Sequence, residues 1–292
     1  MEVIDNWRAR GAHHTVLGHR IFVADVAPRD ARAAPALVLH GFPTSGVDWH
    51  HAVDAINAAG RRAIVPDLLG YGLSDKPNQP YSLFEQANIV DALARDLDVT
   101  SVALVTHDMG DSVGGEVLAR SIDGTLSFEI ERRVLTNGSI YIDMAHLTDG
   151  QQLLLSLPDE QLSDGTAAPN EGLQLALRNT FAPDNTVADD EVAAMAACIV
   201  EGGGNRLLPR LIRYIEERRR HEERWTGAIE KHPAPLDVIW GDLDPIAVWP
   251  MVDRLLAARS DATVHRLDGI GHYPMIESPQ RFGDALRAAL ER

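Results

Sequence analysis

One stretch, residues 102–115 with the sequence VALVTHDMGDSVGG, constrains the fold more than any other part of the chain. An apolar run of strand length ends at THDMG, residues 106–110, and small residues then begin a helical pattern. This pattern is typical of a nucleophile elbow, a sharp turn between a strand and a helix that lifts one side chain above the carboxyl edge of a parallel sheet. The residue at the turn is Asp108, which we predict to be a nucleophile.

Short apolar runs alternate with helical patterns on both sides of this stretch. The runs are a predicted hairpin at 15–26 and single strands at 36–39, 63–65, 102–106, 133–136, 236–240 and 263–267. Such alternation predicts an α/β protein with a mostly parallel, doubly wound sheet. Between 142 and 232 helical patterns continue without a convincing strand, which predicts an inserted helical cap. We therefore expect a core at 1–141, a cap at 142–232 and the rest of the core at 233–292.

Composition excludes several classes of protein. The net charge is -16, from 27 basic and 43 acidic residues, and such a field repels nucleic acids and anionic membranes. No segment resembles a secretory signal or a membrane span, so we expect a cytoplasmic protein. Cys198 is the single cysteine, and no Cys or His cluster has the spacing of metal ligands. We therefore expect no metal and no cofactor, a small-molecule substrate, and either a monomer or a homodimer.

Polar or glycine-rich turns follow five of the predicted strands. In an open parallel sheet, ligands bind beyond the carboxyl ends of the strands. The turns contain HGFP at 40–43, DLLGYG at 67–72, Asp108, Asp244 and His272. The chain order Asp108, Asp244, His272 matches a nucleophile, a supporting acid and a histidine base. The simpler roles are a helix cap for Asp108, a turn residue for Asp244 and a surface loop residue for His272.

A literal serine motif, GDSVG at 110–114, offers a second nucleophile, Ser112. This motif begins four residues after the predicted strand ends at 106, so Ser112 would lie inside the helix. Asp108, in contrast, directly follows the strand. We therefore prefer Asp108 as the nucleophile and keep Ser112 as the alternative.

A carboxylate nucleophile determines the reaction class. Attack by Asp108 on a carbon that carries a leaving group produces an alkyl ester on the protein. A water molecule activated by His272, which Asp244 orients, would then hydrolyse this ester. Backbone N–H groups of Phe42 and Met109 are the expected oxyanion-hole donors. This chemistry indicates an epoxide or an alkyl halide as the substrate.

The motifs together resemble the aspartate-nucleophile branch of the α/β-hydrolase fold superfamily, which contains epoxide hydrolases and dehalogenases. The resemblance rests on HGFP at 40–43, GYGLSDKP at 70–77, HDMG at 107–110, the segment 241–245 and the pair Gly271–His272. A closer resemblance is to mesoderm-specific transcript proteins and their bacterial relatives, through HDMGD at 107–111, YIEER at 214–218, RWTGA at 224–228 and HYP at 272–274. The resemblance implies an α/β-hydrolase core with an inserted cap.

Local residues distinguish the activities within this branch. Similar haloalkane dehalogenases have tryptophan after the nucleophile and asparagine after the HG pair, whereas this chain has Met109 and Phe42. Haloacetate dehalogenases carry arginines just after the nucleophile to bind a carboxylate, whereas Met109, Asp111 and Ser112 offer no positive charge there. The resemblance therefore favours an epoxide hydrolase.

Epoxide hydrolases of this branch donate hydrogen bonds to the epoxide oxygen from two cap tyrosines. Tyr214 fits one of these positions, and Tyr141, at the junction of core and cap, is a weak substitute for the second. Two alternatives stay open. The first is a dehalogenase, with Trp49 or Trp225 as the halide contact, and the second is a catalytically silent binding protein that has kept the fold.

Overall fold

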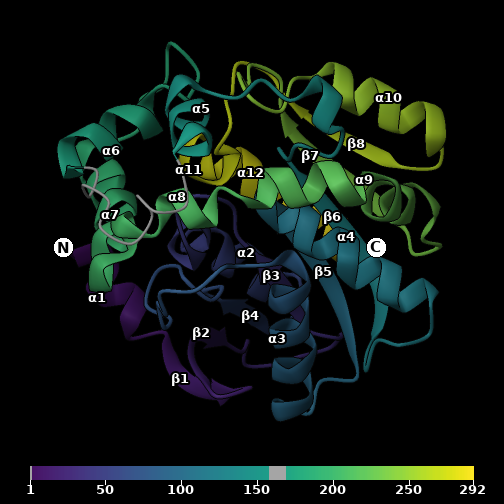
Figure 1. The fold of residues 1–292 in the computed structure, drawn as a ribbon. Coiled ribbons are helices and arrows are strands. Elements are labelled where there is room, and N and C mark those ends of the chain that lie inside the picture. Colours follow the sequence, from purple (N-terminus) through teal and green to yellow (C-terminus); the bar gives the residue numbers. More distant parts are fainter. Residues whose placement is uncertain (1, 158–168) are drawn as a thin grey trace.

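An eight-stranded sheet crosses the centre of the computed structural model, which describes residues 2–157 and 169–292 (Figure 1). The strand order is β1-β2-β4-β3-β5-β6-β7-β8. The strands are β1 (Gly11–Val16), β2 (His19–Val26), β3 (Ala36–Leu39), β4 (Ala63–Pro66), β5 (Ser101–His107), β6 (Glu129–Thr136), β7 (Leu236–Gly241) and β8 (Thr263–Leu267). β2 pairs antiparallel with β1 and β4, and the remaining neighbours are parallel. The predicted α/β class and mostly parallel sheet are confirmed.

The register of the central strands brings the predicted turns to one edge. Leu39 pairs with Thr106 across β3 and β5, and His107 pairs with Thr136 across β5 and β6. The residues that follow these strands therefore leave the sheet side by side. β3 and β4 are buried along their whole length, as expected for apolar strands covered on both faces.

Helices cover both faces of the sheet (Figure 1). α2 packs against α12 on one face, while α3 and α4 pack together on the other. The core helices are α1 (Glu2–Arg8), the 3-10 helix η1 (Gly46–Trp49), α2 (Ala52–Ala58), α3 (Leu83–Asp96), α4 (Met109–Ile122), α10 (Pro250–Ala258), α11 (Pro274–Glu277) and α12 (Pro279–Glu291). α4 also contacts β3, β5 and β6, so its first turn lies at the centre of the sheet edge.

The described residues between β6 and β7, at 137–157 and 169–235, contain helices and no strand; we call them the helical insertion. The helices are η2 (Ile142–Met144), α5 (Asp149–Ser156), α6 (Asn170–Arg178), α7 (Asp189–Val200), η4 (Glu201–Arg206), α8 (Leu208–Leu211) and α9 (Tyr214–Lys231). Leu207, Leu208, Leu211, Ile212 and Ile215 have the spacing of one apolar helical face, which predicts a single helix. The structure divides them between two helices, because helical structure is interrupted between α8 and α9. α9 packs along α4 and thereby ties the helical insertion to the elbow helix (Figure 1).

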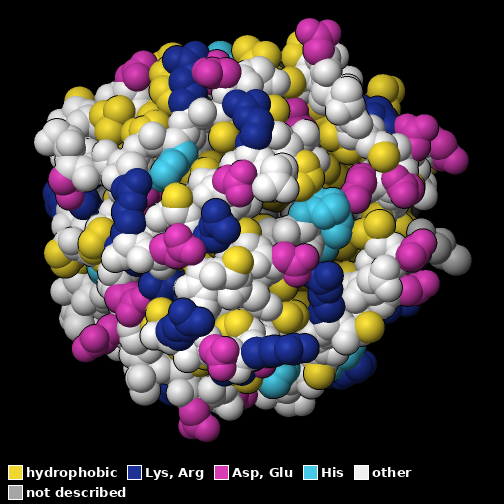
Figure 2. All heavy atoms as spheres, turned by 180° about the vertical axis from the view of Figure 1, so that it is seen from behind, with side chains coloured by type: hydrophobic (Ala, Val, Ile, Leu, Met, Phe, Trp, Pro, Cys, Tyr) yellow, Lys and Arg dark blue, Asp and Glu magenta, His cyan; other side chains and the backbone are white. Residues whose placement is uncertain are grey.

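The surface mixes the two signs of charge. On the face shown in Figure 2, acidic and basic side chains alternate with small apolar areas. The excess of acidic residues is therefore distributed on this face and not gathered in one patch. None of the described helices combines the length and the apolar character needed to cross a membrane.

Close packing between α4 and β3 generates a first prediction. A Cβ atom on Gly110 would lie 2.5 Å from the carbonyl oxygen of Leu39, which belongs to the backbone and cannot move freely. Gly110→Ala should therefore lower the free energy of unfolding by about 3 kcal/mol. The control is Gly227→Ala in α9, where the nearest atom is 3.7 Å away, so this change should be neutral or stabilising by up to about 1 kcal/mol. Urea unfolding measures both variants, and equal losses would contradict this packing.

Candidate active site

Asp108 occupies a strained turn between β5 and α4. Its backbone angles are φ 51° and ψ -116°, in a region that residues other than glycine rarely adopt. Holding such a residue in place costs about 1–3 kcal/mol, and such strain concentrates at functional sites. The turn also needs a glycine opposite it, since a Cβ atom on Gly41 would lie 2.6 Å from the Cβ atom of Asp108. The geometry is that of the predicted elbow.

Two backbone N–H groups hold the carboxylate of Asp108. The N–H of Phe42 donates to Oδ2 at 2.8 Å, and the N–H of Met109 also donates to the carboxylate. Burial raises the pKa of Asp108, while the nearby His272 and the two backbone donors oppose this effect. The two predicted oxyanion-hole donors therefore donate hydrogen bonds to the carboxylate of the predicted nucleophile.

His272 lies between two buried carboxylates. Its Nδ1 is 2.8 Å from Oδ2 of Asp244, and its Nε2 is 3.8 Å from Oδ1 of Asp108. Burial lowers the pKa of the imidazole, but the charge and hydrogen bond of Asp244, together with the charge of Asp108, outweigh burial and raise the pKa to about 9. At neutral pH the resting site therefore holds an imidazolium ion between Asp108 and Asp244.

Asp244 is fixed by three further donors. Its Oδ1 accepts hydrogen bonds from the N–H groups of Ile246 at 2.7 Å and Ala247 at 3.0 Å. Its Oδ2 accepts a hydrogen bond from the side-chain amide of Asn137 at 2.8 Å. These donors satisfy both oxygens and aim Oδ2 at the ring of His272.

Asn137 is a site residue that the sequence analysis missed. Its side-chain oxygen accepts from the N–H of Gly241 at 2.9 Å, while its NH₂ group donates to Asp244. Its φ of 35° is a left-handed conformation that asparagine tolerates better than most residues. The available signal was its position directly after β6, at the same edge of the sheet as Asp108.

The loop that carries His272 is tied to the helical insertion. Glu277 accepts hydrogen bonds from the N–H groups of Ala182 at 2.8 Å, Gly271 at 2.9 Å and Tyr273 at 3.1 Å. The N–H of His272 donates to the carbonyl of Thr180 at 3.0 Å. The position of the imidazole therefore depends on the segment that follows α6.

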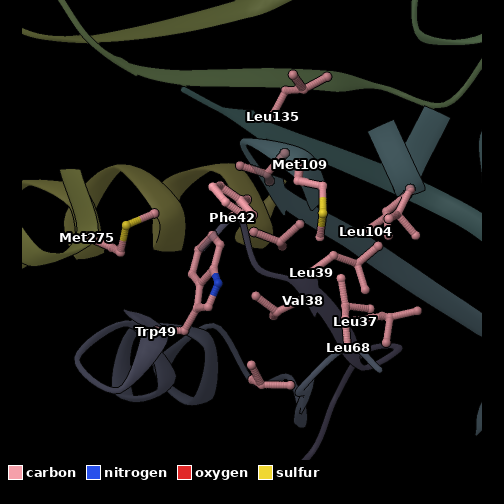
Figure 3. Close-up of a cluster of buried hydrophobic side chains, with 14 of the residues drawn as sticks. Leu37, Val38, Leu39, Phe42, Trp49, Leu68, Leu104, Met109, Leu135 and Met275 are labelled. Carbon is pink, nitrogen blue, oxygen red and sulfur yellow. The ribbon is translucent and has the colours of Figure 1, made fainter. Parts of the chain in front are cut away.

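A cavity of about 290 Å³ opens between His272 and the helical insertion. The core contributes Phe42, Pro43, Ile246, His272 and Tyr273, whereas α5, α6 and α8 contribute mainly leucines. Phe42 also belongs to the cluster of buried hydrophobic side chains drawn in Figure 3, together with Met109 and Trp49. An apolar substrate fits this lining, because only a few polar groups face it.

The four predicted substrate contacts occupy different places, and none of them is among the residues that line this cavity. Tyr214 is buried, with its ring 5.9 Å from the ring of Phe42, and burial and the charge of Asp108 raise its pKa. The hydroxyl of Tyr141 donates to Glu230 at 2.8 Å. The indole N–H of Trp225 donates to Glu116 at 2.9 Å. The structure therefore brings Tyr214 near the site and pairs Tyr141 and Trp225 with carboxylates elsewhere.

Trp49 and Ser112 both lie behind the elbow. Trp49 is fully buried, with its ring edge-on to the ring of His107 at 6.4 Å. Ser112 is buried in α4, and its hydroxyl accepts a hydrogen bond from the guanidinium of Arg218. The position of Ser112 inside the helix agrees with the expectation from the motif spacing.

Tyr71 is a second residue that the sequence analysis did not select. It lies in the turn after β4, and its hydroxyl donates to Sδ of Met109 at 3.1 Å. Burial and then the charge of Asp108 raise the pKa of Tyr71, and Tyr71 in turn affects the pKa of Tyr214. Two protonated phenols from different parts of the chain therefore lie close to Asp108.

The contacts of Asn137 generate a prediction. Asn137→Ala should lower the free energy of unfolding by about 2–3 kcal/mol, because the buried N–H of Gly241 and one oxygen of Asp244 lose a partner. Asn88→Ala, an exposed asparagine in α3, should change stability by less than about 0.5 kcal/mol. Urea unfolding measures both values. A loss for Asn137→Ala no larger than that of the control would show that these hydrogen bonds do not contribute.

Comparisons with known proteins agree with this architecture. The model of the alpha/beta hydrolase family matches residues 36–285. Similar proteins include a putative hydrolase LipZ of Mycobacterium tuberculosis, 34% identical with 98% of each chain covered. The mesoderm-specific transcript homolog protein of Bos taurus is 34% identical, covering 97% of this chain and 86% of the relative. The predicted resemblance to this subgroup is confirmed.

A solved structure supports the fold. The haloalkane dehalogenase DbeA from Bradyrhizobium elkani USDA94 superposes with a TM-score of 0.76 at 22% identity, covering 96% of this chain and 97% of that chain. At this level of identity the likeness concerns the fold alone. The family match over most of the chain and the full-length relatives together show that this chain is a hydrolase of the α/β hydrolase family.

Proposed function

We propose that this hydrolase opens an epoxide to a diol through a covalent alkyl ester on Asp108. The observation that carries the proposal is the orientation of the Asp108 carboxylate. Oδ2 accepts the hydrogen bond from the N–H of Phe42, whereas Oδ1 faces Nε2 of His272 at 3.8 Å. One oxygen is thus held in the candidate oxyanion hole, and the other is available for attack.

The first step forms the ester. Oδ1 of Asp108 attacks an epoxide carbon, the carbon–oxygen bond of the ring breaks, and the released oxygen takes a proton from a phenol. We assign this phenol to Tyr214 or Tyr71, both of which lie near Asp108 and stay protonated because burial raises their pKa. Tyr71 can redirect its hydroxyl towards the substrate at little cost, since its present acceptor, the sulfur of Met109, is a weak one.

The second step hydrolyses the ester. Esterification removes the negative charge of Asp108, which is one of the charges that raise the pKa of His272. The imidazolium then passes its proton to the phenolate and becomes a base. Neutral His272 takes a proton from water, hydroxide adds to Cγ of Asp108, and the N–H groups of Phe42 and Met109 stabilise the oxyanion on Oδ2. Collapse breaks the bond between Cγ and the ester oxygen Oδ1, and the leaving alkoxide takes the proton of the new carboxyl group, which releases the diol and restores the carboxylate.

We further propose that residues 142–232 act as a cap that shapes the substrate site. The cavity supports this assignment, because its walls come from α5, α6 and α8 while its floor contains Phe42 and His272. The apolar lining favours a hydrophobic epoxide over a charged one. Exclusion of water by such a cap would strengthen the electrostatic contacts of Asp108.

Carbon–halogen hydrolysis on the same nucleophile is the competing activity. Of the two tryptophans considered as halide contacts, Trp225 donates its indole N–H to Glu116 and Trp49 is packed against His107. Met109 follows the nucleophile and offers a side chain without an N–H donor. These contacts favour an epoxide over an alkyl halide as the substrate.

Trapping the ester tests the proposal. In His272→Gln, incubation with styrene oxide should leave a stable adduct on the peptide that contains Asp108, because ester formation proceeds and its hydrolysis lacks a base. Asp108→Asn should form no adduct and should reduce diol formation by at least about 10⁴-fold. Mass spectrometry of the digested protein measures the adduct. Absence of an adduct with every epoxide and haloalkane, together with an active Asp108→Asn, would rule out the mechanism.

Release of chloride or bromide from haloalkanes, measured beside diol formation from epoxides, separates the two activities. We expect diol formation to dominate. Halide release that exceeds diol formation would transfer the same mechanism to a dehalogenase.

Single-turnover kinetics test the two phenols. Replacing the phenol that donates the proton, in Tyr214→Phe or in Tyr71→Phe, should slow formation of the ester by about 10²-fold or more and leave its hydrolysis nearly unchanged, because the phenol proton is needed only for ring opening. Tyr81→Phe is the control, since its hydroxyl donates to the carbonyl of Pro77 at 2.7 Å. If both steps slow equally, the tyrosines pack the site and do not donate the proton.

A further inference from the structure

Two histidines and a glutamate from distant parts of the chain meet outside the candidate active site. His50 and His51 lie between η1 and α2 in the core, and Glu191 lies in the first turn of α7 in the helical insertion. One ligand atom from each residue can be chosen so that the three lie within 4.8 Å of one another. All three are common ligands of divalent transition metals.

The hydrogen bond of His50 determines which of its ring nitrogens carries a lone pair. Nδ1 of His50 is 2.8 Å from the carbonyl oxygen of Val47, and a carbonyl only accepts, so Nδ1 holds the proton. Nε2 of the neutral ring is therefore an acceptor, although it lies 3.3 Å from a carboxylate oxygen of Glu191. Two acceptors at this distance repel each other unless a proton or a metal ion lies between them.

Two of the three distances between ligand atoms match those around a metal ion, and all three are within 4.8 Å. Two atoms bound to a tetrahedral zinc ion, each at about 2.0–2.2 Å, lie roughly 3.4 Å apart. The corresponding separations here are 3.3 Å from His50 Nε2 to Glu191 and 3.1 Å from His51 Nε2 to Glu191. The bond from Nδ1 of His50 to a backbone carbonyl also repeats the contact that orients histidine ligands at metal sites. Oε2 of Glu191 is buried and also lies 3.3 Å from Nε2 of His50, and it accepts no hydrogen bond from the described residues.

We propose that His50, His51 and Glu191 bind one divalent transition-metal ion of the zinc class and thereby link the core to α7. Three protein ligands leave the fourth position of a tetrahedral ion open. Water can reach this position, because 38% of the side-chain surface of His51 is exposed. The adjacent Trp49 packs on His107 beside the elbow. The metal would therefore hold η1, which contains Trp49, against the helical insertion.

Zinc binding to the full chain tests the proposal. Equilibrium dialysis at pH 7.5, after removal of metals with a chelator, should give one zinc ion per chain. Saturating zinc should raise Tm by about 4 °C, because a ligand that binds only the folded state stabilises it. His51→Ala and Glu191→Gln should each weaken binding at least tenfold and abolish the rise in Tm, since a lost ligand matters at least as much as a lost supporting contact. His14→Ala, which changes a histidine of β1, should behave like the unchanged chain.

Two results would overturn the proposal. Equal zinc affinity in all four proteins would place the ion elsewhere, for example on His272 and its carboxylates. Absence of stoichiometric zinc binding would leave a proton on His50 as the cation that joins it to Glu191. Circular dichroism of the metal-free variants checks that each has folded, and because two different ligands are replaced, the loss of one variant leaves the other as the test.

Discussion

A buried imidazolium held between two carboxylates is the interaction on which the site depends. Removing such charges from water is costly unless each finds hydrogen-bond partners. Here backbone N–H groups of Phe42 and Met109 hold Asp108, those of Ile246 and Ala247 hold Asp244, and His272 joins the two acids. The sheet edge supplies these donors because parallel strands end there together. The strained backbone of Asp108 is one cost of this arrangement.

The same interaction explains how one histidine could serve two steps. While Asp108 is ionised, its charge and that of Asp244 overcome burial and raise the pKa of His272 to about 9. If Asp108 became an ester, it would lose the charge that helps to raise the pKa of the imidazole, and this pKa would fall. Under the proposed mechanism, Asp108 loses its charge when the ester forms, and this loss makes His272 able to act as a base. Burial at the site makes this coupling large.

Much of the fold and of the candidate site followed from local patterns. The strand runs, the elbow at Asp108 and the turns with Asp244 and His272 are contiguous in sequence, so apolar periodicity and turn chemistry could reveal them. Asn137 was missed because its partner Asp244 lies more than 100 positions further along the chain. Tyr71 was missed because its partner Met109 lies about 40 positions away. Glu277 was also missed, because its contact with the helical insertion, at the N–H of Ala182, spans 95 positions.

Contacts between distant segments explain the remaining differences. Residues 212–213, which separate α8 from α9, contain no glycine or proline, so nothing local marked the interruption of helical structure there. His50 and His51 resemble an ordinary polar pair until α7 brings Glu191 against them, about 140 positions later. Tertiary packing of the helical insertion, which a single sequence does not encode in a local motif, decides these features.

Labelling with oxygen-18 water tests the central claim, the ester on Asp108, most directly. In the proposed mechanism water attacks Cγ of Asp108, so its oxygen enters the carboxylate and the first diol receives an oxygen from the protein. After many turnovers of styrene oxide in labelled water, mass spectrometry should find oxygen-18 in the peptide that contains Asp108, and a single turnover should give an unlabelled diol. A labelled diol from the first turnover, with no label in that peptide, would contradict the account.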